Sequence, residues 1–207
     1  MNDFSRIFLY RMTHIENIPH ILQHGITHIS SPNVNNNYVP IGDGSLIARR
    51  DAFSVGNGRM LGSYIPFYFG TRMPMLYVIQ NGYNGVNAIS PKDIIYCVVS
   101  VEQILNYNLE YVYTDGHAVE SISTFFFPRD IDNIETNIDR EAINSKFWKD
   151  EDDLDKKRRK EAEFLVGNDI PHNAILGYAV YDVAAKAKLV EFGVPEKMIA
   201  IRNEYYF

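Results

Sequence analysis

Two features of this sequence carry side chains suited to chemistry: Glu163, which begins an apolar run, and the arginine pair Arg49-Arg50. Glu163 stands between a charged segment and a Gly-Asn-Asp turn. A carboxylate at the mouth of an apolar strand is partly desolvated, which suits acid, base or cation-stabilising work. The alternative is a rim glutamate paired with a nearby lysine, and spacing alone favours that alternative.

The arginine pair follows a long polar segment, residues 29–45, which is rich in Asn, Ser, Pro and Gly. That composition predicts a loop, and a loop of this length is usually functional or mobile. A pair of guanidinium groups can clamp a phosphate or pyrophosphate through bidentate hydrogen bonds. Most surface arginine pairs have no such role, so the pair alone leaves its function open.

Four histidines lie close together in the first part of the chain: His14, His20, His24 and His28. His20 and His24 are four residues apart on a predicted helix, which is a spacing that metal ligands use. No further carboxylate or thiol completes a ligand set in the sequence, so we expect no metal. Walker and dinucleotide-binding glycine motifs are absent as well.

The chain has 207 residues, and we expect one domain over residues 1–207. Aromatic residues make up 13% of the chain, which favours strands and ring-stacking surfaces. The formal net charge of -6 argues against a nonspecific duplex-DNA binder, because such proteins neutralise phosphates with a basic surface. A nucleic-acid partner must therefore be held by a local site, and a phosphate-bearing small molecule is equally open.

The single cysteine, Cys97, lies in an apolar run, so an intrachain disulfide and a zinc cluster are excluded and a buried thiol is expected. The N-terminal residues mix charged and apolar side chains unlike a signal peptide. No apolar stretch approaches the ~20 residues of a membrane helix. We expect a cytoplasmic protein without a membrane partner.

Apolar and aromatic runs predict strands at residues 8–10, 64–69, 75–79, 93–101, 111–114, 174–181 and 198–202. Helices are predicted after a capping box at Thr13-His-Ile-Glu16, ending at Gly25, and at residues 128–162 and 183–191. Residues 149–160 form a charge run, acidic first and basic after. It suits a solvated helix start, and the alternative is a phosphate-facing basic edge at Lys156 to Lys160.

Three ordered segments are more specific. They are Tyr10-Arg-Met-Thr-His-Ile-Glu-Asn17, then Ile65-Pro-Phe-Tyr-Phe69 with Pro74-Met-Leu-Tyr77, and Ala162-Glu-Phe-Leu-Val166. Together they resemble the DarT family of DNA ADP-ribosyltransferase toxins, from about residue 8 to the C-terminus. The resemblance implies an α+β fold: an ADP-ribosyltransferase-like split mixed β-sheet with flanking helices that binds NAD.

The resemblance also implies the activity and the site residues. ADP-ribose would pass from NAD to a base of single-stranded DNA, and a cognate antitoxin would hydrolyse the mark. Arg50 and Glu163 are the implied catalytic residues. The implied NAD-binding residues are Arg11, Met12, Thr13, His20, His28 and Arg50, and those on the DNA side are Tyr77, His117 and Arg49.

The chemistry fits these residue types. Breaking the bond between nicotinamide and ribose creates an oxocarbenium-like transition state, which a fixed carboxylate such as Glu163 stabilises. A proton-abstracting role for Arg50 is implied by the resemblance only, because a free arginine has a pKa above 12 and is a poor base.

Residue 11 departs from the thymidine-modifying members, which commonly carry His there. The loop from Tyr38 to Leu46 resembles instead the branch linked to guanine, so guanine is favoured over thymine. Two alternatives stay open: a non-catalytic module that binds NAD or nucleic acid, and an ADP-ribosyltransferase that acts on protein or RNA.

Overall fold

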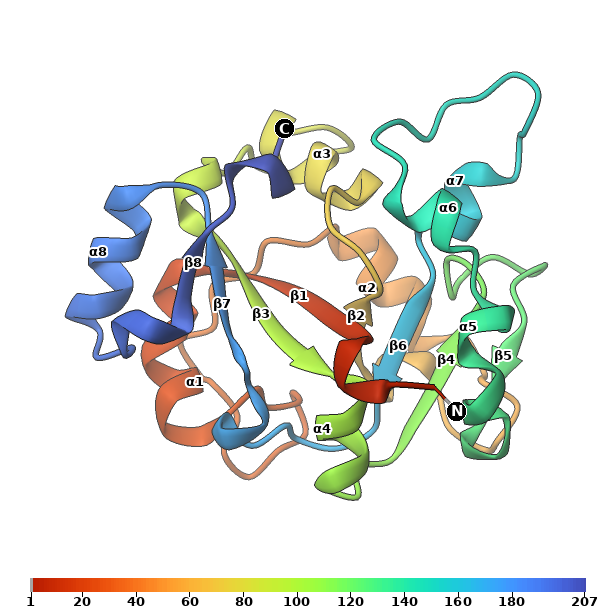
Figure 1. Cartoon of the computed structure of the whole chain (residues 1–207), viewed down its shortest axis with the longest axis horizontal. Coiled ribbons are helices and arrows are strands. Elements are labelled where there is room, and N and C mark those ends of the chain that lie inside the picture. The colour runs from red at the N-terminus through yellow and green to blue at the C-terminus, as the bar shows by residue number, and fades with distance from the viewer. Residues whose placement is uncertain (1) are drawn as a thin grey trace.

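A computed structural model describes residues 2–207 of the chain. Within these residues, eight strands form one sheet in the order β5-β4-β6-β2-β1-β3-β7-β8 (Figure 1). The strands are β1 (Phe8–His14), β2 (Ile65–Tyr68), β3 (Ile94–Ser100), β4 (Tyr111–Thr114), β5 (Phe125–Phe126), β6 (Glu163–Val166), β7 (Gly177–Val180) and β8 (Ile199–Ile201). Only β7 and β8 pair in parallel, so the sheet is mixed, as the sequence predicted.

Helices flank this sheet, confirming the predicted α+β class. They are α1 (Ile18–His24), α2 (Gly44–Asp51), α3 (Pro74–Asn81), α4 (Val101–Asn106), α5 (Ile134–Asn137), α6 (Arg140–Asn144), α7 (Lys156–Lys160) and α8 (Val183–Glu191). Figure 1 shows α8 beside β7 and β8 at one edge, with α5, α6 and α7 gathered near the other. None of the helices in residues 2–207 combines the length and apolar character that a bilayer span needs.

The sheet is joined weakly at its centre. Strands β1 and β3 pair along their full seven residues, whereas β1 and β2 share the single register pair Tyr10 and Tyr68. Beyond Tyr10, the β2-facing edge of β1 therefore has no strand partner among the described residues. Because paired residues point to the same face, Tyr10, Tyr68 and Glu163 occupy neighbouring positions across three strands.

Two predicted elements are wrong, one at the start of the chain and one in the middle. Thr13 does not begin a helix: it belongs to β1, and its hydroxyl accepts a hydrogen bond from the Asn17 side chain. The turn that follows is capped by His14, whose ring accepts from the Glu16 amide. Residues 75–79 form helix α3 rather than a strand, because Pro74 opens a helical turn and Gly82 closes it in the left-handed region.

The region 128–162 is less helical than predicted. It contains the short helices α5, α6 and α7, joined by turns and by an excursion between α6 and α7 that Figure 1 shows projecting from the body. The predicted strand 174–181 is shortened to β7, since residues 172–174 form a 3-10 turn. The other predicted strands and the helix at 183–191 are confirmed, and Cys97 is fully buried.

Gly25 ends α1 as predicted and allows the bridge between Ile26 and Ile170. Its φ is +77°, and a Cβ there would lie 2.0 Å from the Ile170 carbonyl oxygen. Gly25→Ala should therefore destabilise the fold by more than about 2 kcal/mol, measured by denaturant unfolding. Gly44→Ala is the control, because nothing lies within 4 Å of its Cβ position. Equal unfolding midpoints for the two variants would contradict the role of Gly25.

Candidate active site

Glu163 is the first residue of β6 and is almost wholly buried, with 1% of its side chain exposed. Its Oε2 accepts a hydrogen bond from Arg50 Nη1 at 2.8 Å, and its Oε1 accepts one from the Ala118 amide at 3.0 Å. Its own amide donates to the Thr114 hydroxyl at 3.1 Å. The structure thus places Glu163 inside the site, not on a solvated rim beside a lysine.

Arg50 lies in the last turn of α2, which begins where Asp43 caps its N-terminus. The guanidinium reaches Glu163 across 113 positions of sequence, and its Nη2 is buried without a hydrogen-bond partner among the described residues. A buried donor of this kind is costly unless a ligand satisfies it. Arg50 Nη2 is therefore a ready donor for an oxygen of a bound substrate.

His117 belongs to the loop of residues 115–124, which follows β4 and packs on α7. Its amide donates to the Arg158 carbonyl, and its Nε2 lies 4.0 Å from Glu163 Oε1. Burial lowers the pKa of His117, although the Glu163 charge acts in the opposite direction. Burial therefore favours the uncharged ring, and its Nε2 lies beside the carboxylate.

Arg49 also contacts the loop of residues 115–124, because its Nη2 donates to the Val119 carbonyl at 3.0 Å. The predicted residues Arg49, Arg50, Glu163 and His117 are thus brought together. Tyr77 is not: its ring packs against Trp148 and Phe207, with centroids 5.6 and 5.2 Å away, rather than against the Arg50–Glu163 pair.

Three of the residues that the resemblance assigns to NAD line one small cavity of about 20 Å³: Arg11, Thr13 and His20. Asn35 and Tyr38 of the long loop close it. Arg11 also donates to the Pro66 carbonyl at 3.0 Å, across the gap between β1 and β2.

Met12 and His28, which the resemblance also assigns to NAD, do not line this cavity. The Met12 side chain packs on the other face of β1, in the cluster that contains Tyr96. His28 donates from Nε2 to the Gly62 carbonyl at 2.8 Å, while its Nδ1 accepts from the Ser30 amide. Both ring nitrogens are therefore engaged, and the ring ties the long loop to the segment before β2.

The histidine spacing does not produce a metal site. His20 stacks on His24 with ring centroids 4.8 Å apart, and its Nε2 lies 3.2 Å from the Thr27 hydroxyl. Across residues 2–207, no three side chains of His, Cys, Asp or Glu gather closely enough to hold a metal.

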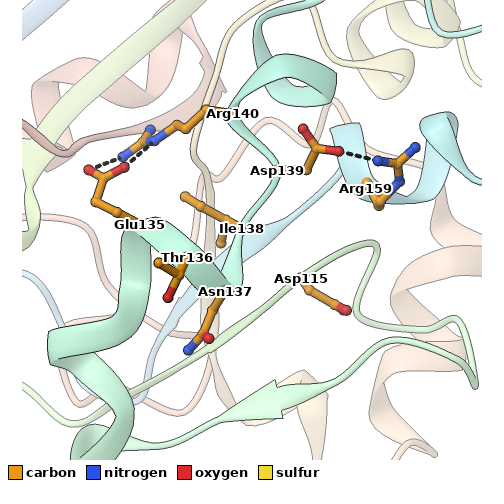
Figure 2. A pocket seen from close by; sticks show the side chains of 8 residues that line it. All are labelled: Asp115, Glu135, Thr136, Asn137, Ile138, Asp139, Arg140 and Arg159. Atoms are coloured by element: carbon orange, nitrogen blue, oxygen red, sulfur yellow. Dashed lines mark hydrogen bonds and ion pairs between the residues drawn. The ribbon is translucent and has the colours of Figure 1, made fainter.

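A larger cavity, about 420 Å³, adjoins the loop of residues 115–124 without containing Glu163 or Arg50 (Figure 2). Its ionised side chains pair with one another, Arg140 with Glu135 and Arg159 with Asp139. Asp115 pairs with Arg158 at 2.9 Å. The guanidinium groups at this cavity are thus already paired with carboxylates, which makes the cavity a poor site for phosphate.

Most of the basic side chains from Lys156 to Lys160 form ion pairs or hydrogen bonds with other parts of the protein. Arg158 pairs with Asp115 and Asp155, and buried Lys160 donates to the Ile143 and Ser145 carbonyls. Only Lys157 in this stretch is exposed and forms no ion pair among the described residues. The alternative of a continuous phosphate-facing edge is therefore not supported.

One buried acidic residue near Glu163 in the sequence was not singled out by sequence reasoning. Glu161 is 6% exposed and lies at the C-terminal end of α7, two residues before Glu163. Burial raises the pKa of Glu161 to about 7, with Lys157 lowering it and the charge of Glu163 adding to the rise. The Glu-Ala-Glu spacing was visible, but whether Glu161 is buried depends on where α7 ends.

Solved structures share this fold. The DarT of Thermus sp. 2.9 in complex with ADP-ribosylated single-stranded DNA superposes with a TM-score of 0.83 at 28% identity, covering 97% of this chain and 96% of that one. The same protein in complex with NAD+ gives a TM-score of 0.79 at 27% identity, covering 100% and 99%. The fold is therefore that of the DNA ADP-ribosyltransferases.

The family follows from sequence comparison. The family model described as "ssDNA thymidine ADP-ribosyltransferase, DarT" matches residues 10–207, and the chain belongs to the DarT family. The DNA ADP-ribosyl transferase of Thermus sp. (strain 2.9) is 32% identical over 96% of this chain and 95% of its own length. A fusion of a DNA ADP-ribosyl transferase with a DNA ADP-ribosyl glycohydrolase from Thermosipho africanus is 31% identical over 76% of this chain and 38% of its own length.

The burial of Glu161 has a measurable consequence for stability. Its folded pKa of about 7 is above the unfolded value, so the ionised form is disfavoured in the fold. The resulting cost is absent below pH ~4 and fully present above pH ~7. Glu161→Gln should therefore raise the free energy of unfolding at about pH 8, by roughly 3 kcal/mol, and change it little at about pH 4. Urea unfolding at both pH values tests this, and a loss of stability at the higher pH would contradict it.

Proposed function

We propose that this chain transfers ADP-ribose from NAD to a base of single-stranded DNA and releases nicotinamide. The observation that carries the proposal is the buried Glu163 carboxylate, held by Arg50 and the Ala118 amide, with His117 Nε2 at 4.0 Å from its Oε1. Membership of the DarT family and the Thermus complexes with NAD+ and with ADP-ribosylated single-stranded DNA support it.

In this proposal Glu163 stabilises the positive charge that develops on the ribose as nicotinamide leaves. A carboxylate fixed by two donors in a site that excludes water is pre-organised for this task. Arg50 donates to Glu163 through Nη1 and directs its unpartnered Nη2 to an oxygen of the substrate. His117 and Arg49 lie on the DNA side, where the exposed Lys157 adds a phosphate contact.

NAD would bind along the free edge of β1, with Arg11, Thr13 and His20 on one side of the strand and Met12 on the other. The cavity beside Arg11 is far smaller than the several hundred Å³ that a nucleotide needs. Binding therefore requires Asn35 and Tyr38 to move with the long loop. His28 acts in this scheme by anchoring that loop to Gly62.

The family membership also supports a biological role. We propose that the chain is the toxin of a toxin–antitoxin pair and that its partner is a hydrolase that removes ADP-ribose from DNA. The Thermosipho relative, in which a transferase and a glycohydrolase are fused, motivates this assignment. In this proposal residues 1–207 form one transferase domain.

Glu163→Gln should reduce transfer to a single-stranded oligonucleotide by about 100-fold or more, because the neutral amide no longer offsets the charge on the ribose. The mass gain of one ADP-ribose on the oligonucleotide is the measurement. Glu196→Gln is the matched control, since Glu196 pairs with Lys186 and is 73% exposed. Near-equal rates for the two variants would remove Glu163 from the mechanism.

The acceptor base is proposed to be guanine rather than the thymidine named in the family description. Arg11 and the loop from Tyr38 to Leu46 motivate this choice. Nucleosides digested from treated oligonucleotides should show ADP-ribose on guanosine by mass spectrometry. ADP-ribosyl thymidine as the product would reverse the base assignment while leaving the activity intact.

The same assay separates the alternatives. NAD binding without nicotinamide release or a DNA product would identify a non-catalytic module. Modification of protein or RNA, with DNA left unmodified, would move the chain to a different acceptor class.

A further inference from the structure

Two cavities meet on one face of the sheet, over strands β1, β3, β7 and β8. The first, of about 300 Å³, extends over β7 and β8. The second, of about 230 Å³, continues past the end of β2 toward α6. Phe8, Tyr10 and Tyr205 line both cavities, which therefore form one groove, called here the β1 groove. Figure 1 shows these four strands side by side with no α-helix in front of them.

Aromatic side chains form the middle of the β1 groove. Phe8 and Tyr10 are two residues apart on one strand, so they share a face of the sheet and lie about 7 Å from each other. Phe8 is 41% exposed, and the Tyr10 ring packs edge-on against Tyr205 with centroids 5.9 Å apart. A sheet that presents aromatic rings at alternate positions is a platform on which the bases of a single strand stack.

The charged side chains that line the β1 groove are all basic. They are Arg6 and Arg140 in the cavity past β2, and Lys197 and Arg202 in the cavity over β8. Arg140 is already paired with Glu135. Arg6 and Lys197 are exposed and form no ion pair within residues 2–207, and the ion pair of Arg202 with Glu204 is long, at 3.9 Å. In a chain of net charge -6, a groove without a lining carboxylate is complementary to a polyanion.

One end of the β1 groove lies close to the candidate active site. Gly70 and Thr71 line the second cavity and follow β2 within three residues. The last residue of β2, Tyr68, pairs with Tyr10 of the groove on one side and with Glu163 on the other. Two strand spacings, about 10 Å, therefore separate the backbone at Tyr10 from the backbone at Glu163. Nucleotides that flank a base held at Glu163 are thus within reach of the groove.

We propose that the β1 groove is a second binding site for the single-stranded DNA whose target base is held at Glu163. The inference rests on the proposed function. Bases beyond the target stack on Phe8 and Tyr10, and their phosphates contact the cations at the two ends of the groove. A single strand fits this site because its base faces are free to stack, whereas a duplex hides them.

The groove would supply affinity that the active site lacks. Most cations of α7 are held in ion pairs, so the contacts near Glu163 grip only a short strand. A strand that occupies both places binds the second one at a high effective concentration. The affinity for DNA should therefore rise with the length of the strand.

Binding without catalysis tests the aromatic platform. Labelled single-stranded DNA of about 20 nucleotides, long enough for a site of roughly 4–16 nucleotides, is titrated without NAD and followed by fluorescence anisotropy. Phe8→Ala should weaken binding about tenfold, because a stacked base is lost. Tyr107→Ala is the matched control, since Tyr107 is 40% exposed and lies outside the groove, and it should bind like wild type. Equal binding by the two variants would overturn the proposal.

A salt series tests the cations. The double variant Lys197→Glu with Arg202→Glu removes two phosphate contacts, so the slope of log affinity against log salt concentration should become shallower by about 1.4. The control, Lys92→Glu with Arg129→Glu, makes the same change in net charge at two exposed residues outside the groove and should leave the slope unchanged. An equal change of slope in both double variants would attribute the effect to net charge and overturn the groove. All four changed side chains are exposed, so these variants fold even if Phe8→Ala does not.

The transfer reaction shows whether the groove and the active site hold one strand. With DNA of about 20 nucleotides, the groove variants should lower kcat/KM about tenfold through KM, with kcat unchanged. With an oligonucleotide of about 4 nucleotides, which the active site alone can hold, kcat/KM should stay within about 2-fold of wild type. An equal loss at both lengths, or no loss at either, would overturn the proposal.

The two proposals fail in different ways. If the wild type binds single-stranded DNA through the groove but modifies no oligonucleotide, the proposed function fails and the groove stands. If the wild type modifies DNA and the groove variants bind and modify it equally well, only the groove fails. Wild-type affinity for a duplex equal to that for the single strand would overturn stacking as the basis of binding.

Discussion

The site depends on keeping one carboxylate, Glu163, out of water. A buried carboxylate is stable only when donors replace its hydration, and here the donors come from two distant segments. The Ala118 amide belongs to the loop after β4, and the guanidinium of Arg50 belongs to α2. Burial of the Glu163 carboxylate therefore requires the loop of residues 115–124 and helix α2 to pack against the same end of β6. Arg49 joins α2 directly to this loop through the Val119 carbonyl, so the two neighbouring arginines make separate contacts, Arg49 with the loop and Arg50 with Glu163.

The ion pairs of α7 limit how this chain, with a net charge of -6, can hold a polyanion such as DNA. Most cations of α7 hold the fold together: Arg158 pairs with Asp115 and supplies the carbonyl to which the His117 amide donates, and Lys160 holds the turn after α6. They cannot also neutralise phosphates. With few free cations near the site, the proposed grip on DNA must be short and must rely on groups such as Lys157 and on stacking of bases. A short single strand meets that condition better than a duplex.

Sequence reasoning recovered the parts of the molecule that local patterns determine. Apolar runs located β2, β3, β4 and β6, and Gly25 marked the end of α1. Residues 75–79 were mistaken for a strand because their apolar run lacks a visible period, and the distinction came from Pro74 and Gly82 at its ends. Thr13 was mistaken for a helix cap because β1 continues to His14 in its pairing with β3, a contact between segments 80 positions apart that no local pattern records.

The residues of the site were less accessible to local reasoning, since spacing alone left Arg50 and Glu163 as ordinary surface residues and only the family resemblance paired them. Glu161 shows why. Two glutamates separated by one alanine have the same local chemistry, yet the Glu163 carboxylate accepts two hydrogen bonds and the Glu161 carboxylate accepts none within residues 2–207. The difference arises because α7 ends at Lys160 and β6 begins at Glu163, so the two side chains leave the backbone in different conformations. The surroundings of Glu161 and Glu163 are therefore set by the junction between α7 and β6, which no local pattern in the sequence records.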